Sequence, residues 1–284
     1  MAELVCPACA GSLSTVEAGL RCAGCGAVYP VVRGIASFLD AAPAGVEDDF
    51  LWDYSADPRI SPLTVARWAV MTRLLDDVDV GPVVVAVGGG GEHWPARRLD
   101  GRVEEYVVVD TSRQQLERQW FPAGARGTAL LAAGERLPLA DRSADTMELW
   151  GVLDHFVDPA AGIAEAARVL RPGGNLLVGL GNDGSWYRRL AGRFAPSDSD
   201  AHHNRFDLEA IRALLGEAFT VTSARTVAYL RLPVRIERMV GRRMGDAARE
   251  RLVEESDRAL RRVLGPHAGG MLLVEARRAG DARP

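Results

Sequence analysis

Residues 82–110 contain an apolar run, four consecutive glycines directly after it and, further on, a second apolar run. The first run, residues 83–87, is apolar at every position, which is typical of a strand buried on both faces of a parallel sheet. Gly88–Gly91 follow, and residues without a Cβ allow positive φ and close approach of a ligand. The second run, residues 106–109, ends on Asp110, about 20 residues after the loop, where a carboxylate often binds ribose hydroxyls. The stretch predicts a nucleoside-binding crevice, although the glycines alone could form a flexible turn.

All four cysteines lie near the N-terminus, as two Cys-x2-Cys pairs separated by twelve residues: Cys6, Cys9, Cys22 and Cys25. Each pair can form a knuckle that presents two thiolates, and two knuckles complete a tetrahedral shell that suits Zn²⁺. The alternative is two disulfides, which a reducing cytoplasm disfavours. Because four cysteines leave no open coordination position, we expect a structural zinc that substitutes for a core too small to form alone.

Bulk composition is that of an ordinary globular protein. Of the 284 residues, 48% are hydrophobic and 25% are charged, and the net charge is −4. There is thus no whole-chain electrostatic argument for nucleic acid. No apolar run approaches the roughly 18 residues that span a bilayer, and no signal peptide is apparent, so we expect a cytoplasmic protein. We divide the chain into a zinc-ribbon domain (1–40), a linker with a leading helix (41–80) and a main domain (81–284).

The segments around the cysteines resemble a small zinc-ribbon family. The resemblance rests on four stretches: residues 4–9, 20–26, 28–31 and 34–35. Members of that family activate methyltransferases as separate subunits or are fused in front of methyltransferase domains. The resemblance implies a docking or stabilising role, with a protein partner as one option, and no chemistry of its own.

Three motifs follow in order in the main domain: E-x-L-P-L with D-x-S-x-D over residues 135–145, V-L-D-H-x-x-D-P over residues 152–159, and R-V-L-x-P-G-G-x-L-L-V over residues 168–178. With the glycine loop, they resemble class I S-adenosylmethionine (SAM)-dependent methyltransferases, of the methyltransferase type 11 kind, over residues 82–180. The resemblance implies an α/β fold, with a doubly wound, mostly parallel, seven-stranded sheet and a ligand at the carboxyl ends of its strands.

The resemblance also implies roles for individual residues towards SAM. Gly88, Gly89 and Gly90 would face its methionine part, and Asp110 and Thr111 would lie at the ribose. Gly134 and Glu135 would lie beside the adenine, and Trp150 and Gly151 beside the sulfonium. Simpler interpretations exist, since Asp110 could only cap a helix and Trp150 could be a core residue.

The family pattern fails at three positions. An acidic residue usually precedes the loop by two positions, where this chain has Ala86. An aspartate usually holds the adenine amino group two residues before Glu135, where this chain has Ala133, and Glu92 replaces a loop glycine. Two lost hydrogen bonds to charged groups, each worth roughly 1.5–3 kcal/mol, could weaken SAM binding from micromolar towards millimolar. An alternative is therefore a methyltransferase fold that has lost methyl transfer and serves as a partner-binding subunit or in other chemistry.

Methyl transfer requires a base only if the acceptor must lose a proton. The candidates are Asp154, His155, His202 and His203, although the histidines could equally be packed or solvated loop residues. The last two lie in the long segment 182–205, which also carries Trp186, Tyr187 and Arg188, and long segments at this edge often cover the substrate.

The acceptor is predicted less directly. Trp186, Tyr187 and Arg188 could line a pocket for an aromatic or anionic molecule, and residues 47–54 could form a lid or simply pack on the domain. The arginine-rich residues 234–264 could bind ribosomal or transfer RNA, but interleaved acidic residues favour a solvated helical face. We favour a small-molecule acceptor, with secondary metabolism as one setting, and treat nucleic acid as the less favoured partner.

Apolar periodicity and helix-capping residues set the remaining expectations. We predict helices over residues 62–78, 111–120, 159–170, 206–217 and 234–264, and strands over residues 128–132, 146–150, 176–180, within 219–232, and over 271–277.

Overall fold

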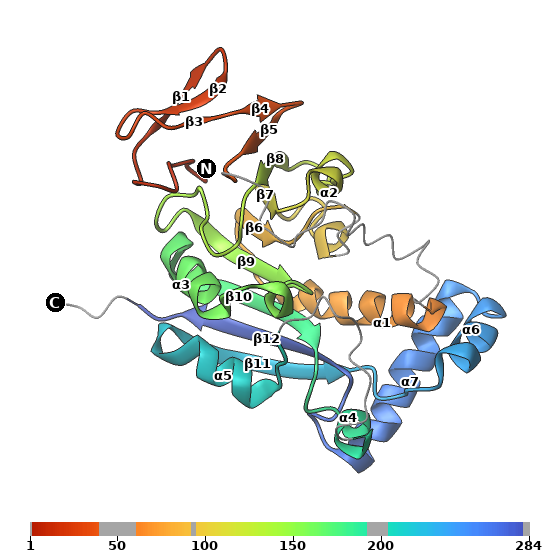
Figure 1. Cartoon of the computed structure of the whole chain (residues 1–284). Coiled ribbons are helices and arrows are strands. Elements are labelled where there is room, and N and C mark those ends of the chain that lie inside the picture. Colours follow the sequence, from red (N-terminus) through yellow and green to blue (C-terminus); the bar gives the residue numbers. More distant parts are fainter. Residues whose placement is uncertain (1, 40–60, 92–94, 192–203, 281–284) are drawn as a thin grey trace.

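The computed structural model, which describes residues 2–39, 61–91, 95–191 and 204–280, contains the doubly wound sheet that the sequence predicts (Figure 1). Nine described strands run in the order β11-β12-β10-β9-β6-β7-β8-β5-β4. Their bounds are β4 (Val31–Val32), β5 (Ile35–Ser37), β6 (Val83–Val87), β7 (Glu105–Asp110), β8 (Arg126–Leu131), β9 (Ala144–Trp150), β10 (Leu170–Gly181), β11 (Phe219–Val227) and β12 (Met271–Arg278). Neighbours from β10 to β5 are parallel, whereas β12 is antiparallel to both β10 and β11.

The chain direction reverses at the centre of the sheet. After β6 the chain continues outward on one side through β7 and β8, and then returns to place β9 on the other side of β6. Segments that leave β6 and β9 therefore diverge at their carboxyl ends, which is where open α/β sheets bind ligands.

The N-terminal segment is divided between two sheets. Strands β1 (Leu13–Val16), β2 (Gly19–Cys22) and β3 (Val28–Tyr29) form a separate antiparallel sheet. The β4–β5 hairpin instead joins the main sheet, because β5 pairs in parallel with the end of β8. Two strands from the predicted ribbon thus extend the seven predicted strands of the main domain.

Helices cover both faces of the sheet (Figure 1). Helices α3 (Pro159–Val169) and α5 (Leu208–Leu215) pack on one face, where Ile163 and Ile211 join the large core cluster. Helices α1 (Pro62–Thr72) and α2 (Arg113–Glu117) pack on the other face. Short 3-10 segments extend α1 and α5, over Arg73–Asp77 and Gly216–Ala218.

Helices α1 and α3 begin at the predicted residues, 62 and 159, and a side chain caps each of them. The Ser61 side chain accepts a hydrogen bond from the Thr64 amide, and the Asp158 side chain accepts from Ala160 and Ala161. Proline occupies the first helical position in both α1 and α3, where its missing N–H costs nothing.

Several predicted helix bounds differ from the observed ones. Helix α2 ends at Glu117, short of residue 120. Helix α3 ends at Val169, one residue before the predicted end, because Leu170 already adopts an extended conformation and pairs with Ala144 at the start of β10. The predicted helix over 234–264 is two helices, α6 (Val234–Arg242) and α7 (Asp246–Leu264), which separate just before Gly245.

A buried ion pair joins α6 to α1. Arg67 Nη1 and Nη2 donate to the two carboxylate oxygens of Glu237 at 3.1 and 2.6 Å, and the two side chains are only 2% and 3% exposed. Ser61 Oγ donates to the same carboxylate, so the start of α1 is held against α6. Within the described ranges, no helix is both long enough and apolar enough to cross a membrane.

Several sequence predictions fall outside the described residues. They are the linker after residue 40, the acidic aromatic segment 47–54, the loop position Glu92, and the candidate bases His202 and His203.

Candidate functional site

The glycine loop meets the segment that follows β9 at the carboxyl edge of the sheet. Gly88 has a φ of +68°, and its amide donates to the Val109 carbonyl at 2.7 Å. A Cβ at this position would lie 2.4 Å from Val152 Cγ2, so only glycine fits here without displacing its neighbour. Gly89 lies over Ala86, since its Cβ would be 2.8 Å from the Ala86 Cβ.

Asp110 holds the glycine loop against the start of α2. Its Oδ2 accepts from the Gly90 amide at 3.0 Å, and its Oδ1 accepts from the Ser112 amide at 2.8 Å. The helix cap itself is Ser112, whose side chain accepts from the Gln115 amide. Asp110 thus connects the glycine loop to helix α2. Contact of Asp110 with a ribose stays a prediction. Thr111 lies between Asp110 and the capping residue Ser112, and its predicted contact with the ribose likewise stays a prediction.

The turn after β8 reaches the same edge. A Cβ on Gly134 would lie 2.5 Å from Phe156 Cζ and 2.7 Å from Val87 Cγ1. Glu135 Oε1 accepts from the Val157 amide at 3.0 Å. The Ala133 carbonyl accepts from the Arg136 amide and closes the turn. The predicted adenine-side residues are therefore packed against the end of β6 and the segment after β9.

Trp150 is a core residue, as the simpler interpretation proposed. It is 6% exposed, its ring fills the space left by Gly179, and its centroid lies 6.3 Å from that of Trp68 on α1. The indole Nε1 is buried and has no hydrogen-bond partner in the described part of the chain. Gly151 follows with a φ of +65° and turns the chain away from the strand. The predicted place of both residues beside a sulfonium is untested by these contacts.

Asp154 and His155 lie in a 3-10 turn, Leu153–His155, next to this edge. The distance from His155 Nε2 to Asp154 Oδ1 is 4.0 Å, too long for a hydrogen bond. Asp154 is 9% exposed, and its backbone carbonyl accepts from the Asn204 amide at 3.1 Å. The turn thus brings two of the four candidate bases to the site.

A pair of buried polar side chains occupies the space beside Ala86. Ala86 pairs in register with Glu148 on β9, and Val84 pairs with Tyr106 on β7, so these side chains share one face of the sheet. Tyr106 reaches across β6 and donates to Glu148 Oε2 at 3.1 Å. Burial and the neighbouring Glu148 raise the pKa of Tyr106 well above its ordinary value. The structure therefore gives a steric reason for alanine at the position where the family usually has an acid.

Replacing Ala86 by aspartate is expected to destabilise the fold. The new carboxylate would be fully buried against Glu148, and burying a second charge without a partner costs several kcal/mol. We expect urea unfolding to show a loss of about 3 kcal/mol. The double variant A86D/E148Q should recover part of this loss, because it removes the neighbouring charge; an A86D variant as stable as wild type would contradict this account of Ala86.

Trp186, Tyr187 and Arg188 start α4 (Trp186–Ala191) beyond β10, and each contacts a neighbour. Trp186 Nε1 donates to the Tyr229 carbonyl at 2.7 Å, and the Arg231 guanidinium lies 4.8 Å from the Tyr187 ring centroid. Arg188 pairs with Asp183 at 3.5 Å. Their predicted role in an acceptor pocket stays a prediction.

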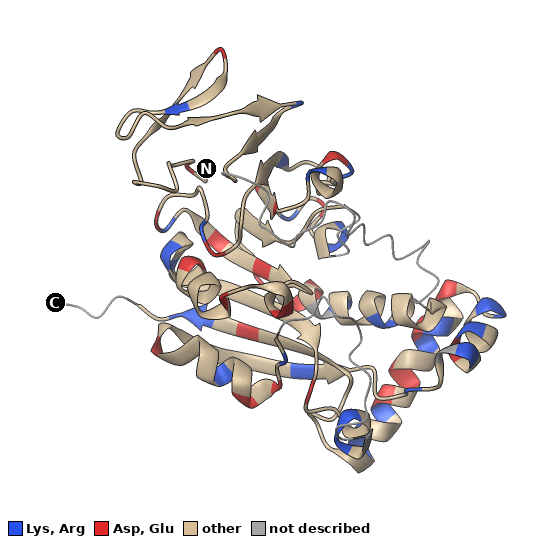
Figure 2. Cartoon of the chain, in the orientation of Figure 1, with Lys and Arg blue, Asp and Glu red and all other residues tan. Residues whose placement is uncertain are grey.

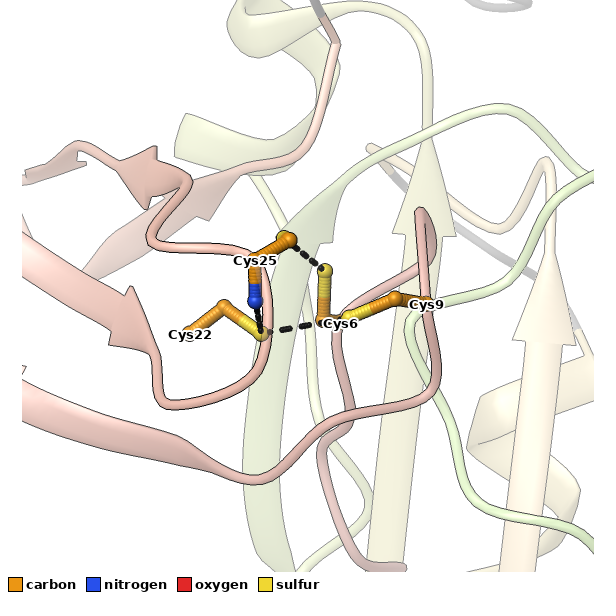
Figure 3. A group of neighbouring side chains, drawn as sticks. All are labelled: Cys6, Cys9, Cys22 and Cys25. Atoms are coloured by element: carbon orange, nitrogen blue, oxygen red, sulfur yellow. Dashed lines mark hydrogen bonds between the residues drawn. The ribbon is translucent and has the colours of Figure 1, made fainter.

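The four cysteine sulfurs converge from two loops of the N-terminal segment (Figure 3). All four Sγ atoms lie within 4.8 Å of one another, and none is in a disulfide. The Cys9–Cys22 and Cys6–Cys25 pairs are 3.4 and 3.6 Å apart, close to the roughly 3.8 Å that tetrahedral Zn–S bonds impose. A Cβ on Gly11 would lie 2.8 Å from Cys22 Sγ, so glycine makes room for the sulfurs.

Hydrogen bonds favour the thiolate of Cys6, the form that binds metal. Burial alone would raise the pKa of Cys6, but hydrogen bonds from Tyr29 and from the Ala8 and Cys9 amides outweigh this and lower it to about 6. The Tyr29 hydroxyl lies 3.0 Å from Cys6 Sγ. The donor set and its surroundings fit a tetrahedral thiolate metal site.

Sequence reasoning missed the residues that support these positions. Gln115, Val152 and Phe156 fix the glycine-containing turns, and Tyr29 supports the cysteines. Val152 and Phe156 lie within the motif over residues 152–159, and Tyr29 lies within the zinc-ribbon resemblance, but neither pattern indicates the contacts these residues make. A separate groove of about 600 Å³ lies between the β4–β5 turn, α2 and β8, away from the predicted cofactor residues.

Residues 85–178 match a family model described as a methyltransferase domain. The match spans the glycine loop, Asp110 and every segment that meets at the carboxyl edge. The sheet order and this match together define the fold as the Rossmann-like methyltransferase fold, and they confirm the predicted resemblance for this part of the chain.

Curated relatives match part of this chain. An uncharacterized methyltransferase of Mycobacterium tuberculosis is 38% identical over 128 residues, which are 42% of this chain and 49% of that protein. An uncharacterized 37.1 kDa protein encoded in a transposon of Streptomyces fradiae is 41% identical over 130 residues, 41% of this chain and 35% of that protein. The chain thus spans half or less of the relatives that it matches.

Solved structures share the fold at low identity. A chain of the complex between the Haloferax volcanii Trm112 methyltransferase activator and a methyltransferase has a TM-score of 0.53 and 17% identity, covering 76% of this chain and 92% of that one. A SAM-dependent methyltransferase of Thermotoga maritima has a TM-score of 0.51 and 17% identity, covering 75% and 91%. The [4+2]-cyclase SpnF has a TM-score of 0.51 and 19% identity, covering 77% and 83%.

Proposed function

We propose that this chain is a SAM-dependent methyltransferase that acts on a small-molecule acceptor. The observation that carries the proposal is the meeting of four segments of the matched domain at one edge of the sheet: the glycine loop, Asp110, the Gly134 turn and the segment after β9. The fit to SAM rests on the loop, where a Cβ on Gly90 would lie 2.7 Å from Asp110 Oδ2 and fill the approach to the carboxylate.

Bound SAM supplies an activated methyl group, so the protein mainly has to orient the reactants and exclude water. Gly88–Gly90 would hold the methionine part, Asp110 the ribose, and the Gly134–Glu135 turn the adenine. Trp150 and Gly151 would close the sulfonium side. If the acceptor must lose a proton, Asp154 and His155 are the candidate bases within the described residues, and His202 and His203 remain proposals.

Charge distribution favours a small molecule over RNA. On α7 acidic residues are interspersed among the arginines (Figure 2), whereas the acidic residue of α6, Glu237, is buried and paired with Arg67. Arg249 pairs with Asp246, and Arg73 on the neighbouring helical segment pairs with Glu250 and Glu254. Arginines that are neutralised by neighbours contribute little to phosphate binding.

The test measures the formation of S-adenosylhomocysteine (SAH) from SAM by the full chain. Pools of small aromatic, anionic and amine compounds are offered as acceptors in one set of assays, and transfer and ribosomal RNA in another. We expect turnover that depends on a small molecule. D110N should reduce it, whereas D100N, which removes an equivalent charge from the exposed Asp100–Ala123 contact, should not. Turnover that requires RNA and falls steeply with salt would overturn the choice of acceptor.

A second candidate is the same fold used for other chemistry. Tyr106 and Glu148 fill the place beside Ala86, and the cyclase SpnF has a similar fold. In that case SAM would bind without SAH formation from any acceptor.

The N-terminal segment supports a structural zinc ribbon. We place Zn²⁺ on Cys6, Cys9, Cys22 and Cys25 because the sulfurs have the spacing of a closed thiolate shell. The free thiols agree with a reducing compartment such as the cytoplasm. The fold neighbour solved with a separate activator supports a docking role, here towards the chain's own domain or a protein partner.

A further inference from the structure

The segment that carries the first cysteine pair runs antiparallel to the segment after the Gly134 turn. The Val5 amide donates to the Pro138 carbonyl at 3.1 Å, and the Ala140 amide donates to the Glu3 carbonyl at 2.8 Å. Leu4 and Leu139 form the bridge between these contacts. The ribbon and the main domain are therefore joined by a short backbone ladder.

Arg136 extends this contact to the cysteine knuckle. Its Nε donates to the Pro7 carbonyl at 2.8 Å. Cys6 lies between Val5 and Pro7, so the two residues that flank a candidate metal ligand both bond to the segment after the turn. Cys6 is 1% exposed and belongs to the same core cluster as Leu137 and Leu139.

The opposite side of the same segment is held by α3. Arg168 Nη2 donates to the Leu137 carbonyl at 3.1 Å, and Nη1 donates to the Leu139 carbonyl at 2.6 Å. Glu165 Oε2 accepts from the Leu137 amide at 2.7 Å. Successive carbonyls thus point alternately to the rigid helix and to the ribbon, so the position of the segment depends on both supports.

We propose that Arg136 and residues 3–7 are positioning elements for the ligand site, through which metal at the cysteines fixes the Gly134–Glu135 turn. Metal on the sulfurs holds the knuckle, the knuckle holds residues 136–140, and these continue directly into the turn. The inference rests on the proposed function, because the ligand of that turn is taken to be the adenosyl group. Coupling of this kind is reciprocal, so bound ligand must tighten metal binding by the same factor.

The experiment measures this coupling in both directions on the full chain. Calorimetric titration with S-adenosylhomocysteine (SAH) is carried out on zinc-loaded and chelator-treated protein, and zinc affinity is measured by chelator competition with and without SAH. We expect zinc to tighten SAH binding roughly 5- to 150-fold, and SAH to tighten zinc binding equally.

Two variants separate positioning from general stability. R136A removes the bond to Pro7 and should weaken SAH binding several-fold while keeping one zinc per chain, and R136K should restore most of the affinity. R33A is the matched control, because Arg33 also joins the ribbon to the main domain, through Glu117 at 3.1 Å, without touching the turn. Equal SAH affinity in R136A and R33A, with zinc retained, would overturn the proposal.

Hydrogen exchange distinguishes this failure from failure of the proposed function. If the zinc-loaded wild type binds no SAH, methyl transfer is refuted and the ligand-coupling proposal falls with it. Amide exchange at residues 134–140 then tests separately whether metal at the cysteines fixes the Gly134–Glu135 turn. Faster exchange there after chelation and in R136A supports the mechanical link, whereas unchanged exchange removes the link as well.

Discussion

Replacing Cys22 by serine is expected to abolish tight zinc binding and to unfold the N-terminal ribbon. Cys22 is 1% exposed, and its sulfur accepts from the Gly24 and Cys25 amides at 3.3 and 3.5 Å, so the thiolate is held at the centre of the cluster. Structural zinc in small domains contributes about 10–16 kcal/mol of apparent binding free energy, and a serine hydroxyl is a poor replacement ligand. Because the small β1–β2–β3 sheet has little core of its own, loss of metal should remove most of its stability.

Metal analysis and hydrogen exchange test this expectation. The wild type should carry one zinc per chain, and C22S should carry far less and lose amide protection over β1 to β3. The control S14A removes an exposed side-chain contact in the same sheet and should keep its zinc. A wild-type preparation that is folded but free of metal would contradict the zinc assignment.

Replacing Arg67 by alanine is expected to be among the most damaging single changes in the main domain. The guanidinium neutralises Glu237 and also donates to the Leu230 carbonyl at 2.8 Å, so truncation leaves a carboxylate buried without its counter-ion. Breaking a buried pair in this way costs about 3–5 kcal/mol, whereas replacing both partners by apolar residues is often neutral. In urea unfolding, R67A should lose roughly this amount and R67M/E237L should lose less. Equal losses in the two variants would argue against an unbalanced charge as the cause.

The same pair gives a pH dependence with a defined sign. Burial disfavours the charged form of Glu237, but its hydrogen bonds and attraction to Arg67 outweigh this, and the pKa of Glu237 is lowered. A lowered folded-state pKa contributes stability that is present above the unfolded value, about 4.3, and is lost as pH falls through the folded value. The stability difference between wild type and E237Q should therefore be constant near neutral pH and shrink below about pH 4. Urea unfolding from pH 7 to 3 measures it, and a difference that grows on acidification would refute the assignment.

Local patterns predicted the elements that build the site. The unbroken apolar run before Gly88 forms β6 as expected, and the helices predicted to begin at residues 62 and 159 do so, capped by Ser61 and Asp158. These features depend on neighbours in sequence, so a single sequence contains them.

Features that depend on distant pairing were not predictable in the same way. The β4–β5 hairpin joins the main sheet because β5 pairs with β8, about 90 residues later, and no local pattern specifies that register. Likewise, Ala86 looked like a defect in sequence, and only the register of three strands shows Tyr106 and Glu148 beside it.

The candidate site was predictable in its residues and less so in their contacts. The spacing of Asp110 from the glycine loop along the sequence was enough to identify it as a candidate. Its hydrogen bonds with the Gly90 and Ser112 amides could be seen only in the structure. Arg136 carried no signal in the sequence, because its partner is the backbone carbonyl of Pro7 in another part of the fold.

The central claim is that the carboxyl edge of the sheet binds SAM despite Ala86 and Ala133. The most direct test is calorimetric titration of the zinc-loaded full chain with SAM and with SAH. The account predicts one site per chain with micromolar affinity, since backbone contacts and Asp110 remain in place. Absence of binding at millimolar ligand, in a folded and zinc-loaded sample, would contradict it.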